Sequence, residues 1–175
     1  MKIAKMKILP FILVIGLFLF SCSPTKSVAF QKSILLQQLK NTHTNQDWFV
    51  PTSLAIKGLN GKQAQWKDST DNHSISQLVA HLTFWNERVL IAYKDDKLPN
   101  FDDDNELTFH NGSDLECMDL VQKLDSVQTE WENAILKSTD EKLLEWNSEI
   151  LNLAAHTAYH TGQIIYIRKR NNWWH

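Results

Sequence analysis

The fold is decided by residues 74–93, SISQLVAHLTFWNERVLIAY. Ser74 and Gln77 form the S-x-x-Q pattern of a capping box, in which each side chain satisfies a backbone N–H at a helix start. From residue 75 to about residue 93, apolar residues recur at steps of three and four, which predicts a helix with one face turned to a core. His81 lies on the same side as Leu78 and Trp85, because residues three and four apart are neighbours on a helix. The stripe consists of Ile75, Leu78, Val79, Leu82, Trp85 and Val89.

Three other segments show the same periodicity. A helix is expected from about residue 29, with Ile34, Leu35 and Leu39 in its stripe, and Pro51 marks a break before a short helical piece that GLNG (58–61) closes. Residues 94–113 are polar and acidic, and they predict a long loop. Two further helices are expected at 114–136 and at about 149–169. The stripe of the first of these is Leu115, Met118, Val121, Leu124, Val127, Trp131 and Ile135.

Composition agrees with an all-α fold. The 175 residues are 43% hydrophobic, and strand-like alternation is scarce, so we expect one domain with a substantial core. Four amphipathic helices predict a four-helix bundle. The formal charge of −2 implies no basic surface, so nucleic acid is not expected as a partner.

The N-terminus reads as an export signal. Lys2, Lys5 and Lys7 precede the apolar run ILPFILVIGLFLF, which is too short to span a bilayer comfortably. It ends in LFSC, which resembles a bacterial lipobox. We therefore expect a signal peptide at 1–21, lipidation of Cys22, a tether over 22–28 and the domain at 29–175. An uncleaved N-terminal anchor is the alternative, and both place the domain on a membrane of the bacterial cell envelope.

Three histidines are candidate metal ligands. His156 and His160 stand one turn apart in the last predicted helix, and Thr157 takes the place where an HExxH zincin has its glutamate. With His81, three imidazoles face inward from two helices. A shared divalent ion would satisfy all three, and three histidines with an open fourth position are typical of catalytic zinc sites. The alternative is that they are packed core residues.

The remaining four histidines are weaker candidates. His43 and His110 lie in polar stretches, and His175 is terminal. His73 precedes the cap of the 75–93 helix, off its inward face.

Three stretches together resemble the DinB-like superfamily of metal-associated four-helix bundles. They are DWFVPTSLAIKGLNGKQAQW, HSISQLVAHLTFWNERVL and HTAYHTGQIIYIRK. The resemblance implies the DinB-like bundle and places the metal ligands on His81, His156 and His160. Gln163 belongs to the signature, either as a second-shell partner of His160 or as a packing residue. Relatives often form dimers, so a homodimer is also expected.

The leading hypothesis is a divalent-metal-dependent enzyme, a hydrolase or a transferase such as a thiol S-transferase, anchored as a lipoprotein. Zinc and nickel are the expected ions, and the small-molecule substrate is not indicated. No acid stands beside the three histidines in sequence to act as a general base, and Glu87 is six residues after His81. The alternative is a non-catalytic module of the envelope that binds a metal or a ligand.

Overall fold

The computed structural model describes residues 24–174 except 71, 96, 98–99 and 111–113; the side chains of 24–29 and 114–117 are also outside the description. The predicted signal peptide and Cys22 therefore lie outside the described residues. All regular structure in the described part is helical, as predicted. None of its helices is both long and apolar enough to cross a bilayer.

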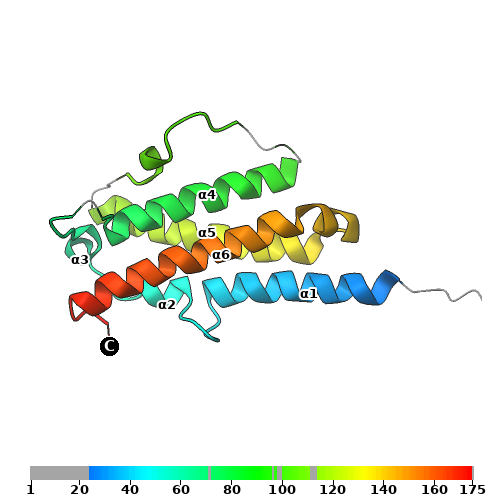
Figure 1. The fold of residues 1–175 in the computed structure, drawn as a ribbon, viewed down its shortest axis with the longest axis horizontal. Helices are drawn as coiled ribbons and strands as arrows, with labels where there is room; N and C mark the ends of the chain where they lie inside the picture. The colour runs from blue at the N-terminus through cyan, green and yellow to red at the C-terminus, as the bar shows by residue number, and fades with distance from the viewer. Residues whose placement is uncertain (1–23, 71, 96, 98–99, 111–113, 175) are drawn as a thin grey trace, which may run out of the picture.

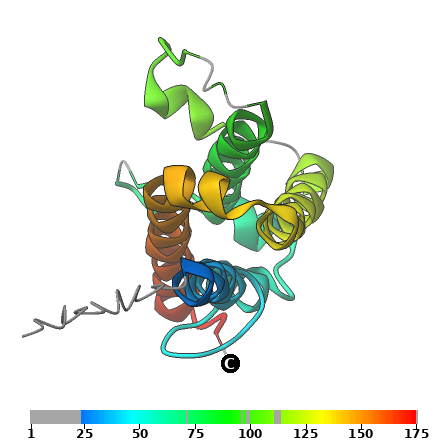
Figure 2. The ribbon, with the colours of Figure 1, turned by 90° about the vertical axis from the view of Figure 1, so that its right-hand side faces the viewer.

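Four long helices make the bundle: α1 (Pro24–His43), α4 (Ile75–Asp95), α5 (Asp114–Lys137) and α6 (Asp140–Arg170). Helices α1 and α4 each pack against both α5 and α6, which places α1 and α4 at opposite corners (Figure 2). Helices α4 and α5 run in the same direction, because the segment between them returns along the length of α4 (Figure 1). Helix α6 therefore runs antiparallel to α4 along a shared interface.

The predicted capping box at the start of α4 is confirmed. The Ser74 N–H donates to Gln77 Oε1 at 2.9 Å, and the Gln77 N–H donates to Ser74 Oγ at 3.2 Å. The apolar stripe that follows is buried over its first two turns, whereas Trp85 and Val89 are half-buried. The cap and the stripe together fix which face of α4 enters the bundle.

Helix α6 begins at Asp140, nine residues earlier than predicted. Thr139 caps it by accepting a hydrogen bond from the Lys142 N–H, and Asp140 and Glu141 stand in the first turn, where carboxylates favour the helix dipole. Residues 140–149 are mostly polar, so the apolar pattern did not predict this part of the helix, although Leu143 is buried in the core.

The N-terminal half also differs in detail. Helix α1 starts at Pro24, five residues before the predicted domain start, since proline is tolerated in a first helical turn. Gly58, with φ of +73°, follows the short α2 (Thr52–Ile56) as predicted. The next residues begin an unpredicted helix, α3 (Gly61–Gln65), with a capping box between Asn60 and Gln63.

Two predicted core positions are wrong. Ile34, in the predicted stripe of α1, is 37% exposed, and Met118, in the predicted stripe of α5, is 61% exposed. Later positions of the same stripe, including Leu124 and Trp131, are fully buried. Among the described stripe positions of α5, Val121 is half-buried and those from Leu124 onward are buried.

The core consists of two apolar clusters. One surrounds Tyr93 and Trp131, and the other surrounds Leu82 and Ile164. Along α6, the residues that contribute to the two clusters leave an interval at 155–163, and this interval contains His156 and His160. The predicted site thus lies where the apolar packing is interrupted.

Candidate metal centre

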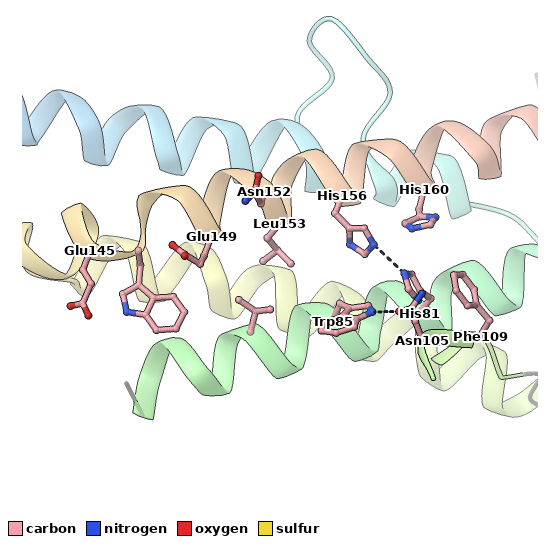
Figure 3. Close-up of a pocket in the computed structure, with 12 residues that line it drawn as sticks. His81, Trp85, Asn105, Phe109, Glu145, Glu149, Asn152, Leu153, His156 and His160 are labelled. Atoms are coloured by element: carbon pink, nitrogen blue, oxygen red, sulfur yellow. Dashed lines mark hydrogen bonds between the residues drawn. The ribbon is translucent and has the colours of Figure 1, made fainter. Parts of the chain in front are cut away.

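His81, His156 and His160 converge in the interface between α4 and α6 (Figure 3). One nitrogen from each ring can be chosen so that all three lie within 4.8 Å of one another. The ring centroids are 4.6 to 5.0 Å apart. Two of the three are deeply buried, with His81 2% and His160 7% exposed. The structure therefore brings together the three residues that the sequence analysis selected.

Hydrogen bonds fix the protonation pattern of His81. Its Nδ1 lies 2.5 Å from Oγ1 of Thr108, and that hydroxyl donates its proton to the carbonyl of Asn105 at 2.6 Å. The hydroxyl oxygen must then accept from His81 Nδ1–H, which leaves Nε2 of His81 without a proton. This Nε2 lies 3.0 Å from Nε2 of His156.

Gln163 sets the same pattern on His160. Its Oε1 accepts from His160 Nδ1–H at 2.6 Å, and its amide nitrogen donates to the hydroxyl of Tyr159 at 3.4 Å. The Nε2 lone pair of His160 is thereby directed away from Gln163 and toward the other two rings. From the sequence, Gln163 was either a hydrogen-bond partner of His160 or a packing residue. Its contact with the outer nitrogen of His160 is the one expected of a residue that orients a metal ligand.

The environment keeps the rings neutral. Burial, with the neighbouring His160 and His156, lowers the pKa of His81 to about 3. Burial and His160 lower the pKa of His156 to about 4. Burial also lowers the pKa of His160, against the raising effect of its Gln163 hydrogen bond. Neutral imidazole is the form that binds metal, so no proton need be displaced near pH 7.

These residues fit a divalent ion. In a tetrahedral site with Zn–N bonds of about 2.0–2.1 Å, two ligand nitrogens lie about 3.3 Å apart. The 3.0 Å between His81 and His156 is close to that separation, and the candidate ligand nitrogens of all three rings lie within 4.8 Å of one another. The outer nitrogens of two rings are already bonded to Thr108 and Gln163, as outer-shell partners of metal-bound histidines are.

An aromatic stack closes one side of the site. The ring of Phe109 lies parallel to the ring of His81, with centroids 3.8 Å apart, and to the ring of His73 on its other face, at 3.7 Å. His73 therefore belongs to the surroundings of the site, and it is separated from His81 by the thickness of Phe109. Neither Phe109 nor Thr108 was selected from the sequence. Their signal is a short apolar interruption, LTF, in the acidic 94–113 stretch.

A cavity of about 710 Å³ opens from the three histidines. It extends along α6 between Trp85 and Val89 of α4 and Trp146 and Leu153 of α6, and its lining is mostly apolar. Trp85 is held at the wall by a 3.2 Å hydrogen bond from its indole N–H to Asn105. The volume is sufficient for a small organic molecule.

In the described part of the chain, no carboxylate contacts the three histidine rings. Glu87, six residues after His81 on α4, pairs with Lys123 of α5 at 2.6 Å. Glu106 lies 3.6 Å from Nε2 of His73, on the far side of Phe109. Glu145 and Glu149 line the cavity two to four turns of α6 away from the histidines. A general base in direct contact with the site is therefore not among the described residues.

The ring of His43 is buried although the surrounding sequence is polar. Its two nitrogens bind Glu132 at 2.8 Å and Asp125 at 2.9 Å, both on α5. His43 thus links α1 to α5 and does not contact the candidate metal centre. His110 is exposed, and His175 lies outside the described residues.

Comparison with protein families gives one result. The family model described as the DinB superfamily matches residues 52–164, a range that contains all three histidines and Gln163. The match begins at α2 and leaves α1 outside it. No curated protein and no solved structure matches the chain.

Proposed function

Because the chain belongs to the DinB superfamily, we propose that it is a divalent-metal-dependent enzyme, a hydrolase or a transferase, whose ion is held by His81, His156 and His160. The observation that carries the proposal is the direction of the ring nitrogens. Thr108 and Gln163 occupy the outer nitrogens of two rings, so their inner nitrogens are free to coordinate one ion.

The residues around the ion divide into three roles. The three histidines would hold it and leave a fourth position facing the cavity. The side chain of Phe109 would shield one flank, and the walls of Trp85 and Leu153 would exclude water from a bound substrate. An ion bound there supplies Lewis acidity, which polarises a substrate oxygen or lowers the pKa of a coordinated water or thiol.

Zinc or nickel is the proposed ion. An all-imidazole donor set suits both, and it disfavours magnesium and calcium, which prefer oxygen ligands. A thiol S-transferase needs a low-molecular-weight reduced thiol as cosubstrate, and such thiols are less reliably available outside the cytoplasm. For an exported protein we therefore prefer the hydrolase over the transferase.

The test is metal content together with stability. Purified protein should bind close to one equivalent of zinc or nickel, and His156→Ala should bind far less. Loading should raise the melting temperature of the wild type, since an ion that binds only the folded state stabilises it. Equal, low metal content in wild type and His156→Ala would refute the proposal.

A second function deserves the same test, namely a non-catalytic module that binds a metal or a ligand in the envelope. One observation favours it: in the described part of the chain, no carboxylate contacts the three histidines. Under this reading the protein binds the ion, yet it hydrolyses no ester, amide or phosphoester in a broad substrate panel under conditions that saturate the site.

We propose that the protein is anchored as a lipoprotein through Cys22, on the basis of the sequence Leu-Phe-Ser-Cys at 19–22. Two acyl chains suffice for stable anchoring. Growth with an alkyne-labelled fatty acid should label the wild type and leave Cys22→Ala unlabelled. An uncleaved anchor would instead give an unlabelled protein that keeps residues 1–21 and stays in the membrane fraction.

A further inference from the structure

The cavity is chemically asymmetric along its length. Three neutral histidines stand at one end, and Glu145 and Glu149 stand on the same helix at the other, as Figure 3 shows. Both glutamates are solvent-exposed, and among the described residues no ion pair or hydrogen bond engages either carboxylate. The histidine end also carries an unengaged group. Nε2 of His160, whose side chain is buried, makes no hydrogen bond to the described residues.

Between the two ends the lining is apolar. Trp85 and Val89 come from α4, and Trp146 and Leu153 come from α6. Trp146 packs edge-on against Tyr93, with ring centroids 5.4 Å apart, so its indole is fixed in the wall. An aromatic surface beside carboxylates suits an organic cation, since the face of a tryptophan also attracts positive charge.

The spacing of residues along α6 sets the length of a ligand that reaches both ends of the cavity. Glu149 precedes His156 by seven residues, and at 1.5 Å per residue this is about 10 Å. A molecule that reaches both ends must therefore have a body of roughly eight carbons. Its middle must be apolar, because the walls offer it few polar partners.

We propose that this cavity takes an elongated amine: a molecule with a metal-coordinating group at the histidines, an apolar body along Trp85 and Leu153, and an ammonium group at Glu145 and Glu149. The inference rests on the proposed function for its metal end. The carboxylates act as specificity residues, which select the charge of the tail and do not touch the reacting group.

Two hydroxamic acids of equal length test the proposal. Hydroxamate chelates zinc, and the chains, of roughly eight carbons, end in a primary amine or in a hydroxyl. Binding to the full-length, zinc-loaded protein in detergent is measured by calorimetry, and zinc content is measured on the same samples. We expect the amine to bind about threefold to tenfold more tightly, as two partly exposed ion pairs allow, and we expect this preference to shrink with added salt.

Variants separate the carboxylates from other causes. Glu145→Gln with Glu149→Gln should abolish the preference for the amine while zinc content and hydroxyl binding stay unchanged. Asp119→Asn, which removes an exposed carboxylate of α5 that is not part of the cavity, should keep the wild-type preference.

Three outcomes would overturn the inference: equal affinity for both compounds, a preference that survives in the double variant, or no binding of either compound by zinc-loaded protein. Each leaves the proposed function standing if zinc is bound. Failure of the wild type to take up either zinc or nickel refutes the proposed function instead. The amine preference of the metal-free protein then decides the inference at its carboxylate end.

Discussion

The Nδ1 nitrogen of His81 and the Oγ1 oxygen of Thr108 lie 2.5 Å apart, although 27 positions separate the two residues in the chain. The Thr108 hydroxyl donates its own hydrogen bond to the carbonyl of Asn105. Thr108 ends the 3-10 helix η1 (Asn105–Thr108), within the stretch predicted to be a loop. A residue outside the four long helices thereby determines which nitrogen of His81 carries hydrogen. The consequence is that the affinity of the site for metal depends on a residue that is not a ligand.

Thr108→Val should therefore weaken zinc binding roughly tenfold, the lower end of what loss of a partner to a metal-bound histidine typically costs. Valine keeps the shape and removes the acceptor. Affinity is measured by competition with a chromogenic chelator. The matched control is Thr83→Val, since Thr83 is also buried on α4's side of the bundle but bonds to the carbonyl of Val79 and not to the site. Equal affinities for Thr108→Val and wild type would contradict the relay.

The metal-free protein should lose stability as the pH falls. His81 and His156 have pKa values of about 3 and about 4 in the fold, against about 6.5 in the unfolded chain. Between pH 6.5 and 4 the unfolded chain therefore binds protons that the folded chain refuses. Stability due to these groups is complete above pH 6.5 and falls below it.

The variant His81→Gln isolates this effect in urea titrations with chelator present. Removing one such group should flatten the slope of unfolding free energy against pH by up to about 1.4 kcal/mol per pH unit between pH 6.5 and 4. His110→Gln removes an exposed histidine and should leave the slope as it is. An unchanged slope in His81→Gln would show that the ring is not kept neutral by the fold.

The parts of the site that were predicted from the sequence are those that helix geometry determines. A period of 3.6 residues places His156, His160 and Gln163 on one face, whatever the rest of the chain does. Thr108 and Phe109 could not be placed in this way, because they reach His81 only through the path of the segment that connects α4 to α5. The burial of His43 has the same origin, since its partners on α5 are 82 and 89 positions away.

His43 should contribute to stability and not to metal binding. Both of its nitrogens face carboxylate oxygens, so His43→Leu leaves the mostly buried charge of Glu132 without this partner. We expect a loss of about 1–3 kcal/mol in the free energy of unfolding, because Glu132 is mostly buried while Asp125 is largely exposed. Zinc content should equal that of the wild type.

A double-mutant cycle tests the contact itself. His43→Gln, Glu132→Gln and the combined variant should give a coupling energy of about 0.5–3 kcal/mol if the two side chains interact in solution. Additive effects would mean that His43 stabilises the protein by packing alone.

Among the basic residues at the C-terminus of α6, Arg168 should contribute most to stability. The sequence indicates only a charge cluster that suits the helix dipole, but the guanidinium is buried and donates to the carbonyls of Ala55 at 2.6 Å and Lys57 at 3.0 Å, at the end of α2. The second guanidinium nitrogen donates to the carbonyl of Trp173 at 3.0 Å.

Arg168→Met keeps most of the side-chain volume and leaves these carbonyls without their donor. We therefore expect a loss of about 3 kcal/mol in the free energy of unfolding, measured in urea. Lys169→Met changes the same charge at an exposed position and should cost less than about 0.5 kcal/mol. Similar losses in the two variants would mean that charge at the helix end, and not the tie to α2, is what stabilises this part of the bundle.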